Sequence, residues 1–255
     1  MIYEIKGKYL EVLNEVKEYG EIIFGRFSQF EIVENKVTNN SLVFKEASVE
    51  INLDGNRKVL KNKIVKTDIY PIINNVIAYL VNDGNNIYMH SIVVSKNNIG
   101  ILIVGNFGQG KTTLAEEFKK NKYEINSTDQ TWLEIKENNI YQKLGSRFDV
   151  KEEKVELLEK NKVSKSIKIE KVIRILGICD NGKPVFNFNE NKYHIIKNLS
   201  YFCNWNYVIP IFTDDVELYN TNLFVKEFLN KLAEMKIQFI DVRGDKTKII
   251  EELGE

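Results

Sequence analysis

The chain has 255 residues, of which 43% are hydrophobic, so it can bury the core of one large domain or two small ones, and global disorder is excluded. Its 36 Lys and Arg residues balance 36 Asp and Glu residues, and this zero net charge removes the broad electrostatic argument for DNA or RNA as a partner. The 2 cysteines make neither a disulfide framework nor a zinc motif, charges fill the N-terminal residues, and no apolar stretch is long enough to span a bilayer, so a cytoplasmic protein without signal peptide or membrane contact is expected.

The first 85 residues predict a mixture of helices and strands. Apolar side chains at helical spacing predict a short surface helix over residues 8–19. A longer helix is expected from Asp68, the candidate N-cap, with Pro71 in its first turn, to the stop signal at residues 82–84. We expect residues 1–85 to be a β-rich extension of the sheet formed by the rest of the chain, within one domain. The expected strands of this part are 21–24 and 47–53.

From residue 86 onward, strands and helices alternate, with a turn at residues 96–98. The short apolar run at 101–104 is typical of a central strand. A charged stretch over 152–162 indicates a solvated helix or loop. This alternation predicts an α/β core with a mixed sheet over residues 86–255. The expected strands are 87–94, 101–104, 123–126, 131–135, 167–178, 207–212 and 237–242, and the expected helices are 111–119, 216–235 and 246–253.

Between the strand at 101–104 and the helix at 111–119 lies a full phosphate-loop (Walker A) pattern, G-x-x-x-x-G-K-[S/T]. Its glycines let backbone N–H groups approach phosphate oxygens, and the helix N-terminus adds a partial positive charge. Lys111 can neutralise the β- and γ-phosphates, and Thr112 can ligate Mg²⁺. The sequence therefore predicts that this loop binds ATP with Mg²⁺. The predicted nucleotide-binding residues are Gly105, Asn106, Phe107, Gly108, Gln109, Gly110, Lys111, Thr112 and Thr113.

Phosphoryl transfer also needs a carboxylate beside the metal or the acceptor, and three aspartates follow candidate strands. Asp180 and Asp241 follow the more hydrophobic ones, as in an ordinary Walker B segment. Topology favours Asp129 instead, because a strand at 123–126 that lies parallel to the loop strand brings both carboxyl ends to one edge of the sheet. We therefore expect Asp129 beside the phosphates, as a metal ligand with Thr112, while Asp180 and Asp241 stay open as alternatives.

Residues 87–135 resemble the kinase domain of HPr kinase/phosphorylase and its smaller relatives. In that family a strand with a His-(Ala/Gly)-x-x-Val motif forms a hairpin with the loop strand, and an Asp-Asp pair follows the helix. His90 matches the family histidine and Asp129 matches the second aspartate, while Thr128 replaces the first. The resemblance implies a phosphoenolpyruvate-carboxykinase-like fold with an antiparallel strand beside the loop strand. The motifs that carry it are 89–94, 100–112 and 126–129.

The resemblance further implies ATP-dependent phosphorylation of a hydroxyl, usually that of a serine. The P-x-x-x-G-R-N signature of HPr kinase itself is absent from the sequence and the N-terminal part is short, so the chain is similar to stand-alone relatives that act on free serine, a peptide or a small protein. Asp129 is then expected to accept the hydroxyl proton, Lys111 to stabilise the transferring group, and His90 to lie at the site. His194 is expected to be structural.

An ATPase or nucleotide-binding switch that phosphorylates nothing is the alternative, because it needs only the phosphate loop. Lys143, Arg147 and Arg174 are interpreted as charges on solvated faces rather than as ligands of the γ-phosphate. The sequence leaves open which hydroxyl is the acceptor, whether ATP, GTP or pyrophosphate is the donor, whether the reverse phosphorolysis occurs, and whether the chain forms a homo-oligomer.

Overall fold

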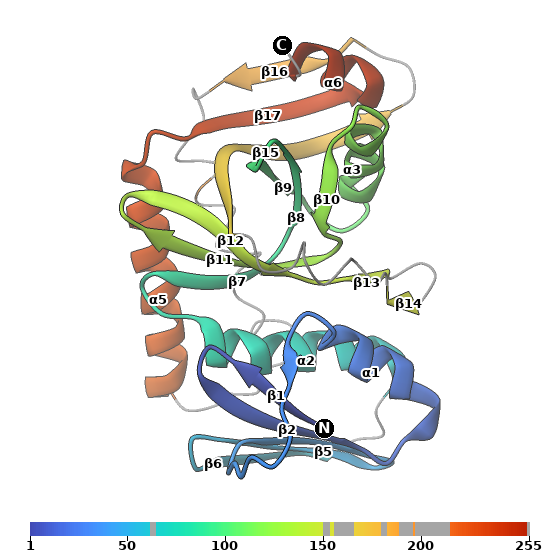
Figure 1. The fold of residues 1–255 in the computed structure, drawn as a ribbon, viewed down its shortest axis with the longest axis vertical. Helices are drawn as coiled ribbons and strands as arrows, with labels where there is room; N and C mark the ends of the chain where they lie inside the picture. The colour runs from blue at the N-terminus through green and yellow to red at the C-terminus, as the bar shows by residue number, and fades with distance from the viewer. Residues whose placement is uncertain are drawn as a thin grey trace.

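The computed structural model describes residues 1–61, 65–149, 154–155, 166–179, 183–188, 196 and 215–253. They form an α/β protein with two large mixed sheets, which lie one beyond the other along the longest axis of the molecule (Figure 1). Helix α5 (Asp215–Glu234) runs along one side of the molecule. Within the described ranges, no helix combines the length and the hydropathy needed to cross a membrane.

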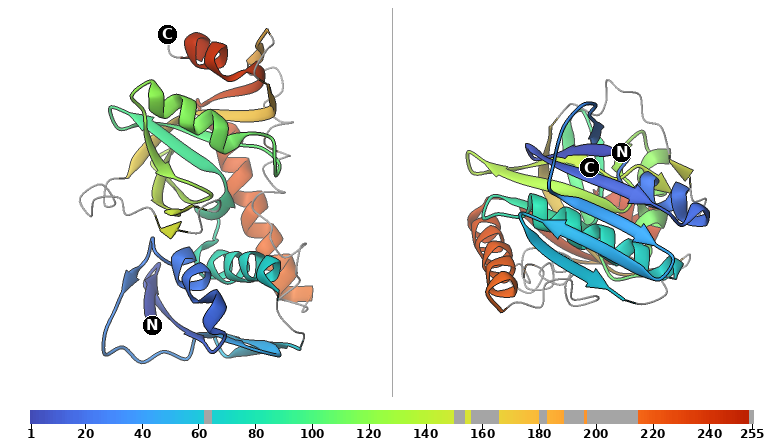
Figure 2. Two further views of the ribbon diagram at one scale, coloured as in Figure 1. Left: turned by 90° about the vertical axis from the view of Figure 1, so that its right-hand side faces the viewer. Right: turned by 90° about the horizontal axis from the view of Figure 1, so that it is seen from below.

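The described part of residues 1–85, here called the N-terminal unit, has its own six-stranded sheet with the order β3-β1-β2-β4-β5-β6. Alternate side chains of its strands are buried in one apolar cluster with α1 and α2, which lie between this sheet and the rest of the protein (Figure 2). The elements are β1 (Ile2–Ile5), β2 (Lys8–Asn14), η1 (Lys17–Tyr19), α1 (Gly20–Arg26), β3 (Glu31–Ile32), β4 (Ser41–Lys45), β5 (Ser48–Leu53), β6 (Asn56–Leu60) and α2 (Lys66–Val81).

Two expectations for the N-terminal unit are wrong. Of the helix expected over residues 8–19, only the short 3-10 helix η1 is helical, and residues 8–14 form strand β2, where Leu10 and Val12 are fully buried and alternate with more accessible neighbours. The apolar residues there fit both periods, and pairing with β1 selects the two-residue period of a strand. The strand expected over 21–24 lies inside α1. The strand expected over 47–53 is confirmed as β5.

The long helix around Pro71 is confirmed as α2, although it begins at Lys66. Asp68 therefore lies in the first turn, where its carboxylate accepts a hydrogen bond from the Val65 N–H at 3.1 Å, and it is not the N-cap residue that we expected. The N-terminal strands also do not extend the sheet of the phosphate-loop motif, because they pair only with one another. The two sheets meet instead through α2, which shares a buried cluster with Tyr88 and Trp132.

The described part of residues 86–255, here called the core unit, contains a nine-stranded sheet. Seven strands follow the order β10-β8-β9-β15-β12-β11-β7, and β17 and β16 continue outward from β15. Helices α3 and α6 pack on one face of this sheet, and α5 packs on the other. The elements are β7 (Asn86–His90), β8 (Ile92–Lys96), β9 (Ile99–Val104), α3 (Lys111–Lys120), β10 (Glu124–Ser127), β11 (Gln130–Lys136), β12 (Asn139–Gly145), β13 (Phe148–Asp149), β14 (Lys154–Val155), β15 (Ile167–Cys179), β16 (Val185–Phe188), α5, β17 (Gln238–Asp245) and α6 (Lys246–Leu253).

Strand β9, which leads into the phosphate-loop motif, lies in the middle of this sheet. It pairs antiparallel with β8 and parallel with β15, so the antiparallel neighbour that the resemblance implies is present. Strand β10 is antiparallel to β8 and therefore runs in the same direction as β9, which brings both carboxyl ends to one edge, as expected. The strand expected over 87–94 is interrupted at Ser91, since β7 pairs with β11 while β8 pairs with β9. The expected strand 207–212 and most of the charged stretch 152–162 lie outside the described residues.

Helix α5 holds the connection between the two units. The Lys231 ammonium group donates hydrogen bonds to the Gly84 carbonyl and to Asn85 Oδ1, both at 2.8 Å, and also pairs with Glu227 one turn earlier at 2.9 Å. From the other side, the Lys6 ammonium group donates to the Val81 carbonyl at 2.7 Å. The connecting residues are thus fixed by side chains from both ends of the sequence.

Candidate functional site

The glycine-rich loop, residues 105–110, links β9 to α3 in a backbone conformation that requires glycine. Gly108 and Gly110 have φ angles of +76° and +96°, which L-residues with a side chain rarely adopt. A Cβ atom at Gly110 would also lie 2.9 Å from the Ile178 Cβ atom. The loop therefore has the position that the phosphate-loop motif requires, after a buried strand and before a helix.

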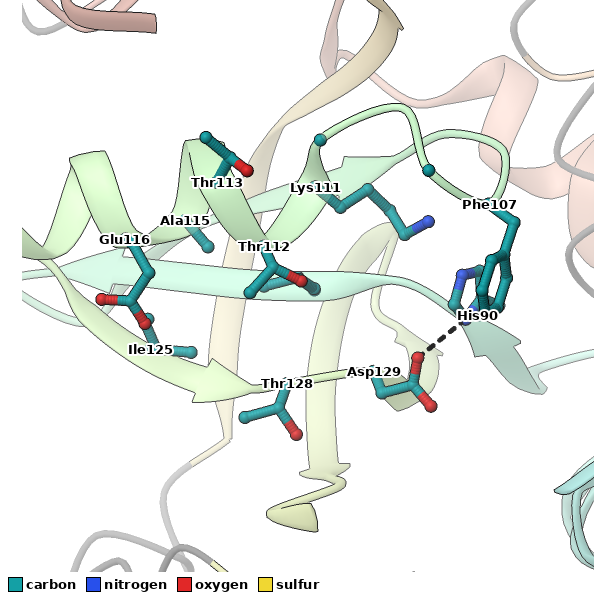
Figure 3. Close-up of a pocket in the computed structure, with 13 residues that line it drawn as sticks. His90, Phe107, Lys111, Thr112, Thr113, Ala115, Glu116, Ile125, Thr128 and Asp129 are labelled. Carbon is teal, nitrogen blue, oxygen red and sulfur yellow. Dashed lines mark ion pairs between the residues drawn. The ribbon is translucent and has the colours of Figure 1, made fainter. Parts of the chain in front are cut away.

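Lys111, the first residue of α3, points back over the loop (Figure 3). Its ammonium group donates hydrogen bonds to the carbonyls of Gly105 at 2.8 Å and Asn106 at 3.2 Å. Burial lowers the pKa of Lys111 to about 8, even though the Asp129 carboxylate acts in the opposite direction. The Gln109 side chain accepts a hydrogen bond from the Asn106 N–H at 2.5 Å and so closes the loop.

A cavity of about 310 Å³ lies between the start of α3 and the ends of β7 and β10. Lys111 and Thr112 border it from the α3 side, and His90 and Asp129 border it from the opposite side (Figure 3). These four residues, which the sequence predicts for the site, thus border one cavity. The lining residues are His90, Ile92, Phe107, Gly108, Gly110, Lys111, Thr112, Thr113, Ala115, Glu116, Ile125, Thr128 and Asp129.

Asp129 is buried, and each of its carboxylate oxygens has a polar partner. Arg26 donates a hydrogen bond from its Nη1 group to Oδ2 at 2.5 Å, and His90 Nδ1 lies 3.2 Å from Oδ1. Burial raises the pKa of Asp129, but the hydrogen bond from His90 and the charges of His90 and Arg26 outweigh burial and lower that pKa to about 2. Asp129 is therefore ionised at neutral pH.

His90 is held between two aromatic side chains. Its Nδ1 atom is hydrogen-bonded to the Tyr70 hydroxyl at 3.0 Å, and the Phe107 ring stacks on the imidazole with 6.1 Å between centroids. Gln130 Nε2 donates a hydrogen bond to the same Tyr70 hydroxyl at 2.5 Å. Burial raises the pKa of Tyr70 well above its ordinary value, so this hydroxyl stays protonated. The 83% exposed Phe107 side chain is thus the outer wall of the His90 site.

Sequence reasoning missed Arg26 and Tyr70. Both come from the N-terminal unit, Arg26 at the end of α1 and Tyr70 in the first turns of α2. The Arg26 guanidinium lies over the rings of Tyr70, at 4.2 Å from the centroid, and Phe148, at 4.7 Å. No motif marks either residue, because their partner Asp129 is far away in the sequence.

The competing aspartates do not border the cavity as far as the structure describes them. Asp241 accepts two hydrogen bonds from Arg174, at 2.7 and 2.5 Å, and both side chains are buried within the sheet between β15 and β17. Asp180 and His194 lie outside the described residues. Of the three candidate aspartates, Asp129 is therefore the one that borders the described cavity.

The interpretation of Arg147 and Arg174 as solvated charges needs correction. Arg174 is buried because it pairs with Asp241, and Arg147 is 9% exposed. Lys143, by contrast, is partly accessible and pairs with Glu134 at 3.2 Å. Burial lowers the pKa of Arg147, and neither an ion pair nor a hydrogen bond to its side chain occurs in the described part of the chain.

The oxygen atoms that line the cavity fit a metal ion only when phosphate oxygens of a bound nucleotide complete the coordination. Among the described residues, no three His, Cys, Asp or Glu side chains are grouped as a metal site. The Thr128 hydroxyl donates to the carbonyls of Ser146 and Phe148, at 3.0 and 2.9 Å, so it is committed to the backbone. Thr112 and Asp129 stay available from opposite walls of the cavity. Mg²⁺ is typically held by one or two protein oxygens plus substrate phosphates, so this pair is sufficient for a nucleotide-bound ion.

Comparisons with known proteins leave the family open. No protein-family model and no curated protein matches the chain. Among solved structures, the HPr(Ser) kinase/phosphatase from Coxiella burnetii aligns over 40% of this chain and 76% of that chain, with 12% sequence identity and a TM-score of 0.29. A similarity at this level carries no argument, so the functional proposal has to rest on the site.

Proposed function

We propose that this protein is a Mg²⁺-dependent kinase that binds ATP at the glycine-rich loop and transfers the γ-phosphate to a hydroxyl. The observation that carries this proposal is the shared cavity, in which Lys111 and Thr112 face Asp129. An ATPase needs the loop alone, whereas a kinase needs a carboxylate where the acceptor hydroxyl meets the phosphate. The resemblance of residues 87–135 to HPr-kinase-like sequences supports the same class and suggests serine as the acceptor.

The residues of the cavity then have the following roles in the reaction. The loop N–H groups and Lys111 bind the phosphates, and Thr112 and Asp129 would hold the Mg²⁺ ion, which supplies positive charge beside the transferring group. Asp129 accepts a hydrogen bond from the acceptor hydroxyl and receives its proton as the new bond forms. His90 fixes the Oδ1 side of that carboxylate, and Phe107 covers His90 from solvent.

One observation favours a second candidate, an ATPase or nucleotide-binding switch without an acceptor. Both oxygens of Asp129 already have a partner, and a pKa of about 2 makes this carboxylate a weak proton acceptor. In a loose phosphoryl-transfer reaction, however, positioning matters more than basicity. This favours the kinase, because a fixed, ionised carboxylate can still orient a hydroxyl.

The test is to follow the label from γ-labelled ATP with the full chain and Mg²⁺, with free serine, serine-containing peptides and small proteins as acceptors. We expect label on an acceptor, and Asp129→Asn should slow the transfer by roughly 10²–10⁴-fold while ATP still binds. Asp54→Asn is the matched control, since Asp54 lies at the surface of the N-terminal sheet and pairs with Lys8. Label found only in free phosphate would show that the protein is an ATPase. Phosphate transfer at the wild-type rate by Asp129→Asn would show that Asp129 is not the proton acceptor.

A further inference from the structure

Arg26 is the contribution of the N-terminal unit to the cavity of the core unit. It ends α1 and is 6% exposed, and its Nη1 group donates to Asp129 Oδ2, 103 positions later in the sequence. Helices α1 and α2 lie between the two sheets (Figures 1 and 2), and Arg26 is the last residue of α1. The contact therefore joins the two units at the candidate site.

The guanidinium is fixed by more than this ion pair. Tyr70 from α2 and Phe148 from the core unit stack against it, so its plane and its distance from Asp129 are both restricted. Asp129 is the sole hydrogen-bond partner of Arg26 within the described residues. Since both side chains are buried, this charge-assisted hydrogen bond is strong and directional.

The contact with Arg26 restricts the orientation of the Asp129 carboxylate. Arg26 and His90 hold its two oxygens from the sides, and the carboxylate borders the cavity that Lys111 and Thr112 border from the opposite wall. A negatively charged group beside polyphosphate would be repelled, and a fixed cation behind it offsets that repulsion. Arg26 itself is not among the residues that line the cavity, so it acts through Asp129.

We propose that Arg26 is a positioning residue that holds Asp129 toward the cavity, so that the N-terminal unit is a part of the active site. The inference rests on the proposed phosphotransfer function. It predicts that loss of Arg26 impairs the chemical step and the metal-dependent part of nucleotide binding, while binding of nucleotide without metal depends on the loop and is unchanged.

The experiment compares Arg26→Gln, Asp129→Asn and the double variant in the full chain. We expect Arg26→Gln to lower kcat at least tenfold and to raise the KM for Mg²⁺-bound ATP, while its affinity for ATP without Mg²⁺ stays within about threefold of wild type. The double variant should be no slower than Asp129→Asn alone, because Arg26 acts through that carboxylate. Arg26→Lys keeps the charge and should recover part of the lost rate. The control is Arg57→Gln, since Arg57 is an exposed partner of Glu50 in the N-terminal sheet.

Two outcomes overturn the inference: wild-type kcat in Arg26→Gln, or a double variant in which the two single effects multiply. If Arg26→Gln does not fold, Arg26→Lys is the variant that tests the inference. A wild-type kcat in Arg26→Lys, together with a slow Asp129→Asn variant, would then also contradict it. If the wild-type chain transfers no phosphate, the proposed function fails, and binding of a fluorescent ATP analogue still tests Arg26. Its affinity with Mg²⁺ should then fall at least tenfold in Arg26→Gln, its affinity without Mg²⁺ should not change, and an equal affinity with Mg²⁺ would refute the positioning role.

Discussion

Nucleotide binding should take up a proton at Lys111. In the free protein, burial lowers the pKa of this ammonium group to about 8, so it is half neutral at a mildly alkaline pH. A bound polyphosphate places negative charge beside the ammonium group and raises its pKa. The protonated form therefore binds more tightly, and affinity must fall as the pH rises through the pKa of the free protein.

The size of the effect follows from that pKa. If only the charged form binds, the dissociation constant scales with the inverse of the protonated fraction of Lys111. This fraction falls from about 0.9 at roughly pH 7 to about 0.1 at roughly pH 9, so affinity should weaken about tenfold between these values. An unperturbed lysine would change its protonation only slightly over the same range.

Titration of a fluorescent ATP analogue across this range, with calorimetry in buffers of different ionisation enthalpy, measures both the affinity and the proton uptake. Lys111→Arg is the control, because an arginine stays charged throughout and should flatten the pH dependence, whatever its absolute affinity. A wild-type affinity that is constant over this range, without proton uptake, would show that burial does not neutralise Lys111.

Three further predictions concern stability and the loop. The partners of Asp129 outweigh its burial and lower its pKa from 3.8 to about 2. Between these two pH values the native state binds fewer protons than the unfolded chain, so the free energy of unfolding should fall as the pH drops through this range. Asp129→Asn should flatten this part of an acid titration. Gly110→Ala, which combines a φ of +96° with a close contact, should cost about 1–3 kcal/mol of stability and weaken nucleotide binding in a urea and ligand titration, whereas Gly177→Ala, with open space around its Cβ, should do neither. Arg174→Met should lower the free energy of unfolding by about 3–5 kcal/mol, because it leaves Asp241 as a buried unpaired charge. Asp241→Asn, where it folds, should bind nucleotide with Mg²⁺ as tightly as wild type. A tenfold loss of that affinity would show that Asp241 belongs to the site.

The core unit was predictable because its local signals agree. The apolar run of β9, the glycine-rich loop and the amphipathic start of α3 all specify one strand–loop–helix segment. The N-terminal unit was harder to predict, because short strands such as β2 carry apolar spacings that fit two periods, and only pairing with β1 decides between them. The split of residues 87–94 at Ser91 depends on two different partner strands, which local sequence does not encode.

The candidate site likewise contains residues that local sequence predicts and residues that it does not. Lys111, Thr112 and Asp129 were predictable, since each lies at the end of a buried strand or the start of a helix at one edge of the sheet. Arg26 and Tyr70 were not, because their positions depend on how α1 and α2 pack against another sheet. The burial of Arg174 was likewise hidden, since it depends on the register of β15 and β17.

The bonds that Lys231 of α5 makes across residues 84 and 85 restrict how the protein can open. A bend at this connection would break two hydrogen bonds from α5 and the Lys6 contact on the other side together. The lining residues that the structure describes all fall within 90–129, so access to them does not require the two sheets to separate. We therefore expect a ligand to enter beside the exposed Phe107 side chain, without separation of the two sheets.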